Sequence, residues 1–297
     1  MTTWRAAAGN LHHMTTPQTI GVIGAGTMGS GIAQVCALAG LSAAVMDIDE
    51  QRVARGRGAV AGALEKLVKK EKLSAADRDA ALGRLRGTTD YGALSGCDFI
   101  VEAATEDEPL KLKILRQVDA VAKDDAIVAT NTSSISITKL GAATKRPARF
   151  VGLHFFNPVP LMALVEVVRG RQTDDATVGA AVALAKRLGK TPVVVKDSPG
   201  FVVNRLLCPM LNEAVLAYGE GIASAHDIDE AMKLGCNHPI GPLALADLIG
   251  LDVLLAVMEV FHREFKDPKY RPAPLLKEMV AAGKFGRKSG RGFHTYG

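Results

Sequence analysis

The chain has 297 residues, of which 48% are hydrophobic and 23% are charged. These proportions exclude disorder as the dominant state, because this apolar content can bury a sizeable core. The formal net charge is +5, and only 5% of the residues are aromatic. So mild a charge and so few aromatic rings exclude a dedicated nucleic-acid binder, although they are compatible with an anionic small molecule.

Membrane spans, disulfides and metal sites find no support in the sequence. No apolar run reaches the roughly 18 residues that a membrane-spanning helix needs. The chain has four cysteines without a C-x-x-C pair, at Cys36, Cys97, Cys208 and Cys236. This scatter disfavours both a disulfide framework and a zinc site. We expect a reduced, cytoplasmic protein, and a flexible extension at residues 1–16, which lack a signal-peptide pattern.

The first two thirds of the chain alternate short apolar runs with helix-length segments. Strands are predicted over 19–23, 43–46, 98–101, 126–129, 150–153 and 192–195, and helices between them over 28–38, 52–72 and 111–123. Strands that are apolar throughout are typical of a parallel sheet covered on both faces. The sequence therefore predicts an α/β domain, doubly wound and of the Rossmann type, over 17–199.

The pattern changes after Pro199. From Phe201 onward, apolar residues recur at helical spacing, and a further helix is predicted over 253–265 with Asp252 as its cap. The only strand expected in this half is short, over 292–296. The sequence thus predicts an all-helical C-terminal domain over 200–297. Its apolar runs at 243–246 and 254–257 favour a homodimer formed through this half.

A glycine-rich loop follows the first predicted strand and opens the first predicted helix. It reads Gly24, Ala25, Gly26, Thr27, Met28, Gly29. In such a loop the first glycine permits a tight turn, the second lets backbone approach a pyrophosphate, and the third lets helix pack closely on strand. This context favours a dinucleotide site over the alternative, which is a simple tight turn.

Asp47 ends the second predicted strand, where a carboxylate accepts hydrogen bonds from a ribose 2′-hydroxyl. The same carboxylate repels a 2′-phosphate, so NAD is favoured over NADP as the cofactor. Arg52 and Arg55 lie nearby in the sequence, and their positive charges would offset part of the repulsion of a 2′-phosphate. The choice between NAD and NADP therefore stays partly open.

A histidine and a glutamate stand in two strongly apolar stretches. His154 follows the predicted strand at 150–153, and Glu166 lies further along in the run Leu164–Val168. Leaving either group unpaired in such surroundings is costly, so a His–carboxylate pair is the economical arrangement. Such a pair is typical of a general base for an alcohol proton. The alternative is a structural histidine bonded to backbone, but alcohol oxidation beside a dinucleotide site needs a base.

Several longer motifs resemble the L-3-hydroxyacyl-CoA dehydrogenase family, and within it the bacterial 3-hydroxybutyryl-CoA dehydrogenases. They occupy 131–134 (NTSS), 152–168 (GLHFFNPVPLMALVEVV), 198–205 (SPGFVVNR), 236–242 (CNHPIGP) and 286–290 (GRKSG). The resemblance runs from Thr19 to Tyr296. It implies reversible, NAD-dependent oxidation of a short-chain L-3-hydroxyacyl-CoA to the 3-ketoacyl-CoA, with the helical domain binding the acyl-CoA thioester.

The resemblance also implies roles for single residues. His154 corresponds to the general acid/base and Glu166 to its partner, while Ser133 and Asn204 match residues that hydrogen-bond the substrate's 3-oxygen or thioester region. Besides the glycine loop, the family's NAD contacts fall on Asp47, Glu106, Lys111, Ser133, Asn157 and Lys288. Its coenzyme A contacts fall on the helix around 64–72, where Lys66 and Lys70 suit the phosphates.

Plainer interpretations exist for several of these residues. Ser133 suits a turn, Asn204 a helix cap, and the lysines at 66–70 a solvated helix face. The chain also departs from the family pattern, with Ala63 where a serine is common and Ala163 where animal relatives carry lysine.

Three other functions remain as alternatives. One is a β-hydroxyacid or 6-phosphogluconate type dehydrogenase, which uses a lysine as acid/base. Another is a hydrolase built on Ser133, His154 and Glu166, although the chain has no G-x-S-x-G sequence. The third is a non-enzymatic NAD-binding protein. The presence of His154, Glu166, Ser133 and Asn204 disfavours this alternative.

Overall fold

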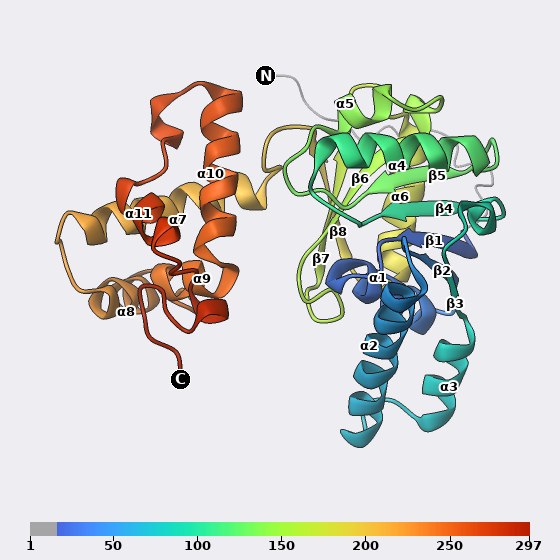
Figure 1. Cartoon of the computed structure of the whole chain (residues 1–297), viewed down its shortest axis with the longest axis horizontal. Helices are drawn as coiled ribbons and strands as arrows, with labels where there is room; N and C mark the ends of the chain where they lie inside the picture. Colours follow the sequence, from blue (N-terminus) through green and yellow to red (C-terminus); the bar gives the residue numbers. More distant parts are fainter. Residues whose placement is uncertain (1–16) are drawn as a thin grey trace. The chain divides into compact units, whose positions relative to one another are not determined.

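The computed structural model describes residues 17–297, and the extension predicted at residues 1–16 lies outside them. The described chain divides into two compact units (Figure 1). The first comprises residues 17–132 and 137–196, and the second comprises residues 133–136 and 197–297. None of the helices in the described part is long and apolar enough to cross a membrane.

An eight-stranded sheet, in the order β3-β2-β1-β4-β5-β6-β7-β8, forms the centre of the first unit as described. Its strands are β1 (Thr19–Ile23), β2 (Ser42–Met46), β3 (Leu85–Thr88), β4 (Phe99–Glu102), β5 (Ile127–Thr130), β6 (Phe150–Phe155), β7 (Leu164–Arg169) and β8 (Thr191–Lys196). All neighbours are parallel except β6 and β7, which are antiparallel. The predicted sheet is confirmed, but it is not wholly parallel, and β3 and β7 were not predicted as strands.

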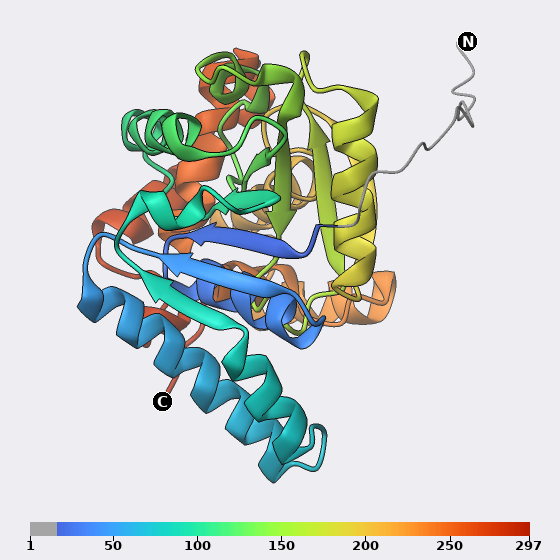
Figure 2. The same ribbon diagram turned by 90° about the vertical axis from the view of Figure 1, so that its right-hand side faces the viewer.

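Helices cover both faces of this sheet. They are α1 (Thr27–Leu38), α2 (Glu50–Lys69), α3 (Ala75–Gly83), α4 (Glu108–Val121), α5 (Ile137–Ala142) and α6 (Asp175–Arg187). One large apolar core joins α1 and α6 to the strand residues of one face. Figure 2 shows α4 on the opposite face from α6, and α2 projecting beyond the sheet together with α3. The doubly wound arrangement predicted from the sequence is thus confirmed.

Capping side chains correct the predicted helix bounds. The helix predicted over 52–72 begins at Glu50, because Asp49 accepts a hydrogen bond from the backbone N–H of Arg52. The helix predicted over 111–123 begins at Glu108, because Asp107 caps it in the same way through Leu110. An N-cap aspartate satisfies an amide that would otherwise lack a partner, so it decides where a helix starts.

The second unit is helical, as predicted. It contains α7 (Val203–Gly219), α8 (Ala225–Cys236), α9 (Pro242–Ile249), α10 (Leu251–Phe265) and α11 (Pro274–Ala281) around a separate apolar core. The predicted cap of α10 is wrong. Asp252 lies in the first turn of this helix, and the N-cap residue is Gly250, with a φ of 106°.

The segment predicted as a strand over 292–296 forms only isolated bridges within the described chain. The side chain of Asp247 explains this difference. Its two carboxylate oxygens accept hydrogen bonds from the backbone N–H groups of Phe293 and His294, at 3.0 and 2.9 Å. Amides that are satisfied by a carboxylate do not need a neighbouring strand.

Candidate active site

The glycine loop joins β1 to α1, and close approach of backbone explains its glycines. Gly24 has a φ of 99°, and a Cβ there would lie 2.6 Å from the carbonyl oxygen of Ala103. A Cβ on Gly29 would clash with the carbonyl oxygen of Gly24, so only glycine lets α1 start so near the strand. A Cβ on Gly26 would meet nothing within 4 Å. The space beside Gly26 is therefore open to a ligand.

The position of the loop in the sheet is that of a nucleotide site. From β1 the chain builds β2 and β3 on one side and β4 to β8 on the other, which makes the carboxyl end of β1 a topological switch point. Gly26 is the N-cap of α1 and offers no side chain to the first amides of the helix. Those N–H groups and the helix dipole are suited to hold a phosphate.

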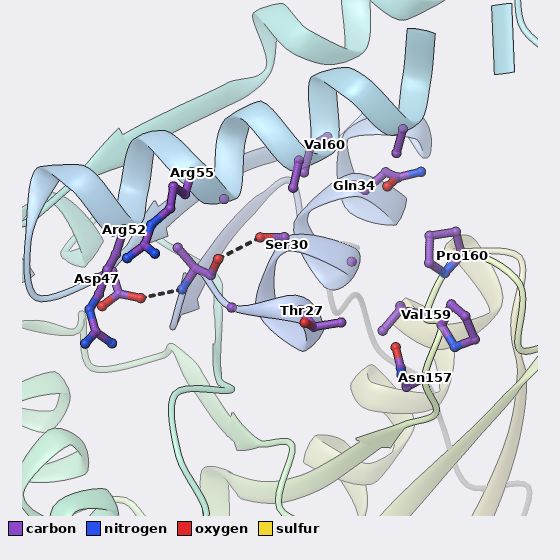
Figure 3. A pocket seen from close by; sticks show the side chains of 17 residues that line it. Thr27, Ser30, Gln34, Asp47, Arg52, Arg55, Val60, Asn157, Val159 and Pro160 are labelled. Carbon is purple, nitrogen blue, oxygen red and sulfur yellow. Dashed lines mark hydrogen bonds between the residues drawn. The ribbon is translucent and has the colours of Figure 1, made fainter. Parts of the chain in front are cut away.

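Asp47 directly follows β2, and its side chain forms a hydrogen bond with the backbone of the glycine loop. Its Oδ2 accepts a hydrogen bond from the backbone N–H of Ala25 at 2.7 Å (Figure 3). Its Oδ1 accepts one from the backbone N–H of Ile48, also at 2.7 Å. An ionised carboxylate has about four acceptor positions, so two remain for ribose hydroxyl groups. The predicted ribose contact is therefore compatible with this geometry and stays a prediction.

Two cavities flank the loop within the first unit. The larger has a volume of about 570 Å³ and lies between α1, α2 and the loop residues Asn157–Pro160 (Figure 3). The smaller, of about 390 Å³, lies on the other side of Asp47 and is lined by residues that include Tyr91 and Gln117. Burial, together with the negative charges of Glu102 and Asp47, raises the pKa of Tyr91, so its hydroxyl stays protonated near neutral pH.

His154 and Glu166 meet inside the sheet. They are direct partners across the antiparallel strands β6 and β7, and their side chains lie on the same face. The imidazole Nδ1 lies 2.7 Å from Glu166 Oε2, and the two residues are only 6% and 1% exposed. The ring of Phe156 packs against the imidazole at 4.5 Å between centroids. The carboxylate thus sets the orientation of the imidazole in a largely dry environment.

The strand register places this pair at the same edge of the sheet as the glycine loop. Ile23, the last residue of β1, is aligned with Glu102, which is aligned in turn with Thr130. Thr130 is aligned with Gly152, and His154 lies two residues beyond Gly152 on the same face. His154 therefore lies past the carboxyl ends of β4 and β5.

A buried ion pair lies at this edge as well. Lys111 Nζ is 2.5 Å from Glu102 Oε2, and neither residue is more than 1% exposed. Glu102 also accepts a hydrogen bond from the Thr130 hydroxyl, while Glu106 lies 3.8 Å from the lysine and binds the hydroxyl of Thr132. The predicted cofactor contacts Lys111 and Glu106 are thus brought together, and Glu102 was missed. The signal available was a carboxylate that ends the otherwise apolar run Phe99–Val101.

The remaining predicted residues fall in two places. Asn157 lines the 570 Å³ cavity, whereas Lys66 on α2 and Lys70 at its C-cap are exposed and do not line it. Ser133, Asn204 and Lys288 belong to the second unit. Because Val202 is the N-cap of α7, the interpretation of Asn204 as a helix cap is wrong. Lys288 forms an ion pair with Asp252 at 2.6 Å.

A buried lysine that sequence reasoning missed holds the loop of the larger cavity. Lys190 is 8% exposed, and its Nζ donates to the carbonyl oxygens of Val159 and Met162 at 2.5 and 2.9 Å. Burial lowers the pKa of Lys190. The residues described here also include no cluster of His, Cys, Asp or Glu that could hold a metal ion.

A dinucleotide loop at a topological switch point is typical of a nicotinamide-dependent enzyme, and the buried His–Glu pair lies at the same edge of the sheet. Residues 19–198 match the "3-hydroxyacyl-CoA dehydrogenase, NAD binding domain", and residues 200–296 match the "3-hydroxyacyl-CoA dehydrogenase, C-terminal domain". The chain belongs to the 3-hydroxyacyl-CoA dehydrogenase family. This confirms the resemblance found in the motifs and the prediction of NAD as the cofactor.

Relatives from several bacteria are similar over almost the whole chain. The probable 3-hydroxybutyryl-CoA dehydrogenase of Deinococcus radiodurans is 52% identical over 276 residues, which cover 93% of this chain and 99% of the relative. The 3-hydroxybutyryl-CoA dehydrogenase of Bradyrhizobium diazoefficiens is 50% identical, with 93% and 94% covered. The crystal structure of (S)-3-hydroxybutyryl-CoA dehydrogenase PaaH1 from Ralstonia eutropha is 60% identical, with a TM-score of 0.93 and coverage of 95% and 99%.

Proposed function

We propose that this chain catalyses the reversible, NAD-dependent oxidation of short-chain L-3-hydroxyacyl-CoA, with 3-hydroxybutyryl-CoA and acetoacetyl-CoA as the reacting pair. The observation that carries the proposal is the buried His154–Glu166 pair at the sheet edge where the glycine loop opens. The relatives named 3-hydroxybutyryl-CoA dehydrogenase support the choice of substrate.

His154 is the general acid/base of the reaction. In oxidation it takes the proton of the 3-hydroxyl group, and in reduction it returns a proton to the 3-oxygen. Glu166 engages Nδ1, so we assign the proton transfer to Nε2. The carboxylate also stabilises the imidazolium that forms when the ring takes up the proton. Ser133 and Asn204 are assigned to the polarisation of the 3-oxygen or the thioester.

The glycine loop and α1 suit NAD, whose nicotinamide supplies the hydride acceptor that no protein side chain can provide. The open space beside Gly26 and the uncapped amides of α1 fit a pyrophosphate. Asp47 is assigned to the ribose 2′-hydroxyl, where its charge disfavours NADP. Lys111, Glu106, Asn157 and Lys288 are proposed as further contacts.

The 570 Å³ cavity is the proposed site for the acyl-CoA arm. One face of α2 lines it through positions three and four residues apart, among them Arg52, Gly56 and Ala63. The same spacing carried further reaches Lys66 on α2 and Lys70 at its C-cap, so these ammonium groups extend the lining face and suit the coenzyme A phosphates. Ala63 also lines the cavity and stands where a serine is common in the family, so this chain lacks that contact.

We also propose that the chain forms a homodimer through its second unit. Three large apolar side chains of this unit are exposed and would be covered by a partner, since Leu206, Ile222 and Leu234 are 68%, 69% and 82% exposed.

Steady-state rates with 3-ketoacyl-CoA substrates from C4 to C16, each with NADH and with NADPH, test the proposed function. We expect the highest kcat/KM for acetoacetyl-CoA with NADH. Higher activity on free 3-hydroxybutyrate would favour a β-hydroxyacid dehydrogenase instead. NADH binding without oxidation of NADH on any of these substrates would favour a non-enzymatic role.

A further inference from the structure

A glutamine lies almost completely buried in the wall of the 570 Å³ cavity. Gln34, on α1, is 5% exposed and is surrounded in sequence by the buried apolar residues Ala33 and Val35. Among residues 17–297, its side-chain amide forms no hydrogen bond with the protein, and its polar atoms are accessible from the cavity. An unpaired polar group costs about 1–3 kcal/mol, so an amide in such a wall makes its hydrogen bonds with whatever fills the cavity. The Gln34 amide therefore points to a ligand with complementary polar groups.

The face of α1 that lines the cavity has the helical spacing Thr27, Ser30, Gly31, Gln34. The Ser30 hydroxyl is used inside the protein, since it donates to the carbonyl oxygen of Ala25 at 2.9 Å. Gln34 is buried in the same wall as Ser30, but its side chain has no such hydrogen-bond partner among the described residues. Figure 3 shows Gln34 at the end of the cavity away from Asp47.

The walls around this end of the cavity are apolar and well anchored. A Cβ on Gly31 would lie 2.8 Å from Val159, so the loop that carries Val159 packs directly on α1, one turn before Gln34. Val60 and Ala63 of α2 and Pro160 also line the cavity, while its charged residues Asp47, Arg52 and Arg55 lie toward the other end (Figure 3). The end of the cavity at Gln34 therefore offers apolar walls around a buried amide, which has one acceptor oxygen and two donor hydrogens.

We propose that Gln34 is a specificity-determining residue that hydrogen-bonds an amide group of the pantetheine arm of the acyl-CoA substrate. The arm alternates methylene segments with two secondary amides, each with one donor and one acceptor, and this matches the apolar walls around the Gln34 carboxamide. The inference rests on the proposed function. It extends that function by naming the residue that distinguishes a coenzyme A thioester from a simple thioester.

The test compares the wild type with Gln34→Met, which keeps side-chain length and loses the hydrogen-bonding groups. The matched control is Gln51→Met, the same change at an exposed position of α2 that does not line the cavity. The substrates are acetoacetyl-CoA, acetoacetyl-pantetheine and S-ethyl acetothioacetate, which has no amide. The affinities for coenzyme A and for NADH are measured by calorimetry, independently of turnover.

For Gln34→Met we expect KM for both amide-containing substrates to rise about tenfold, with kcat unchanged. KM for the amide-free thioester and the affinity for NADH stay as in the wild type, and the affinity for coenzyme A falls about tenfold. The melting temperature is unchanged or higher, because the amide has no partner among the described residues.

Three results would overturn the inference: an unchanged KM for acetoacetyl-pantetheine, an equal rise for the amide-free thioester, or weaker NADH binding, which would assign Gln34 to the cofactor. If the wild type binds coenzyme A but does not reduce acetoacetyl-CoA, the proposed function fails. The calorimetric comparison of the two variants then still decides the role of Gln34.

Discussion

His154 and Glu166 are paired residues of the antiparallel neighbours β6 and β7, and their side chains meet at 2.7 Å on one face of the sheet. The pair depends on the loop over 156–163, which reverses the direction of the chain between β6 and β7. This reversal brings Glu166 directly opposite His154 on the neighbouring strand. A shift of one residue in the register would move Glu166 to the opposite face. The contact between His154 and Glu166 therefore depends on the register of a single hairpin.

Glu166→Gln tests the orienting role of the carboxylate. We expect kcat for acetoacetyl-CoA reduction to fall by about 10²-fold or more, because the imidazolium loses its counter-charge. KM and the affinity for NADH stay near their wild-type values, since Glu166 touches neither ligand in this account. Glu166→Asp, which keeps the charge, restores part of kcat. A variant that loses NADH affinity and kcat together would indicate a structural role instead.

Lys190→Met tests the anchoring of the loop that lines the larger cavity. The substitution removes two hydrogen bonds from a charged donor to the carbonyl oxygens of Val159 and Met162. We expect the free energy of unfolding to fall by about 1–3 kcal/mol and KM for acetoacetyl-CoA to rise. Urea denaturation and steady-state kinetics measure the two effects. Lys186→Met, at an exposed position of α6, is the control and should change neither.

Asp98→Asn tests a pH-dependent contribution to stability at the amino end of the sheet. Partial burial alone would raise the pKa of Asp98, but the Lys123 ammonium and the backbone N–H groups of Gln18 and Thr19 outweigh it and hold the pKa well below its usual range. A carboxyl whose pKa is lower in the folded state stabilises the fold above its unfolded pKa of about 3.9. This stabilisation is lost as the pH falls below that value.

The expected difference in unfolding free energy between wild type and Asp98→Asn is about 1 kcal/mol at pH 7, since the side chain is one third exposed. The difference should shrink as the pH is lowered below about 4. Asp125→Asn, at a 71% exposed carboxylate 3.7 Å from the same lysine, is the control. A difference of the same size at pH 7 and pH 3 would contradict this interpretation.

Local patterns in the sequence were sufficient for most of the fold. The run Thr19–Ile23 followed by the glycine loop carries its own strand, turn and helix signals, and the structure contains all three. The proximity of His154 and Glu166 was also predictable from the sequence. Both polar groups lie in apolar stretches, and burying either one without a partner would be costly. The signals for the loop are local, whereas the signal for the pair comes from two apolar stretches twelve residues apart.

Features that depend on distant partners were missed or wrong. The antiparallel placement of β7 follows from its pairing with β6, and the ion pair of Lys111 joins α4 to Glu102 at the end of β4. The tail at 292–296 pairs with Asp247 rather than with a strand, which no local pattern could indicate. Gln34 was overlooked because a single amide in an apolar helix acquires meaning only when the cavity beside it is known.

His154→Gln, studied by NADH binding and acetoacetyl-CoA reduction in parallel, tests whether His154 is the general acid/base. We expect an unchanged dissociation constant for NADH and a fall in kcat of about 10²–10⁴-fold, because the general acid/base is lost while the nucleotide site stays intact. Near-normal turnover in this variant would exclude His154 as the general acid/base.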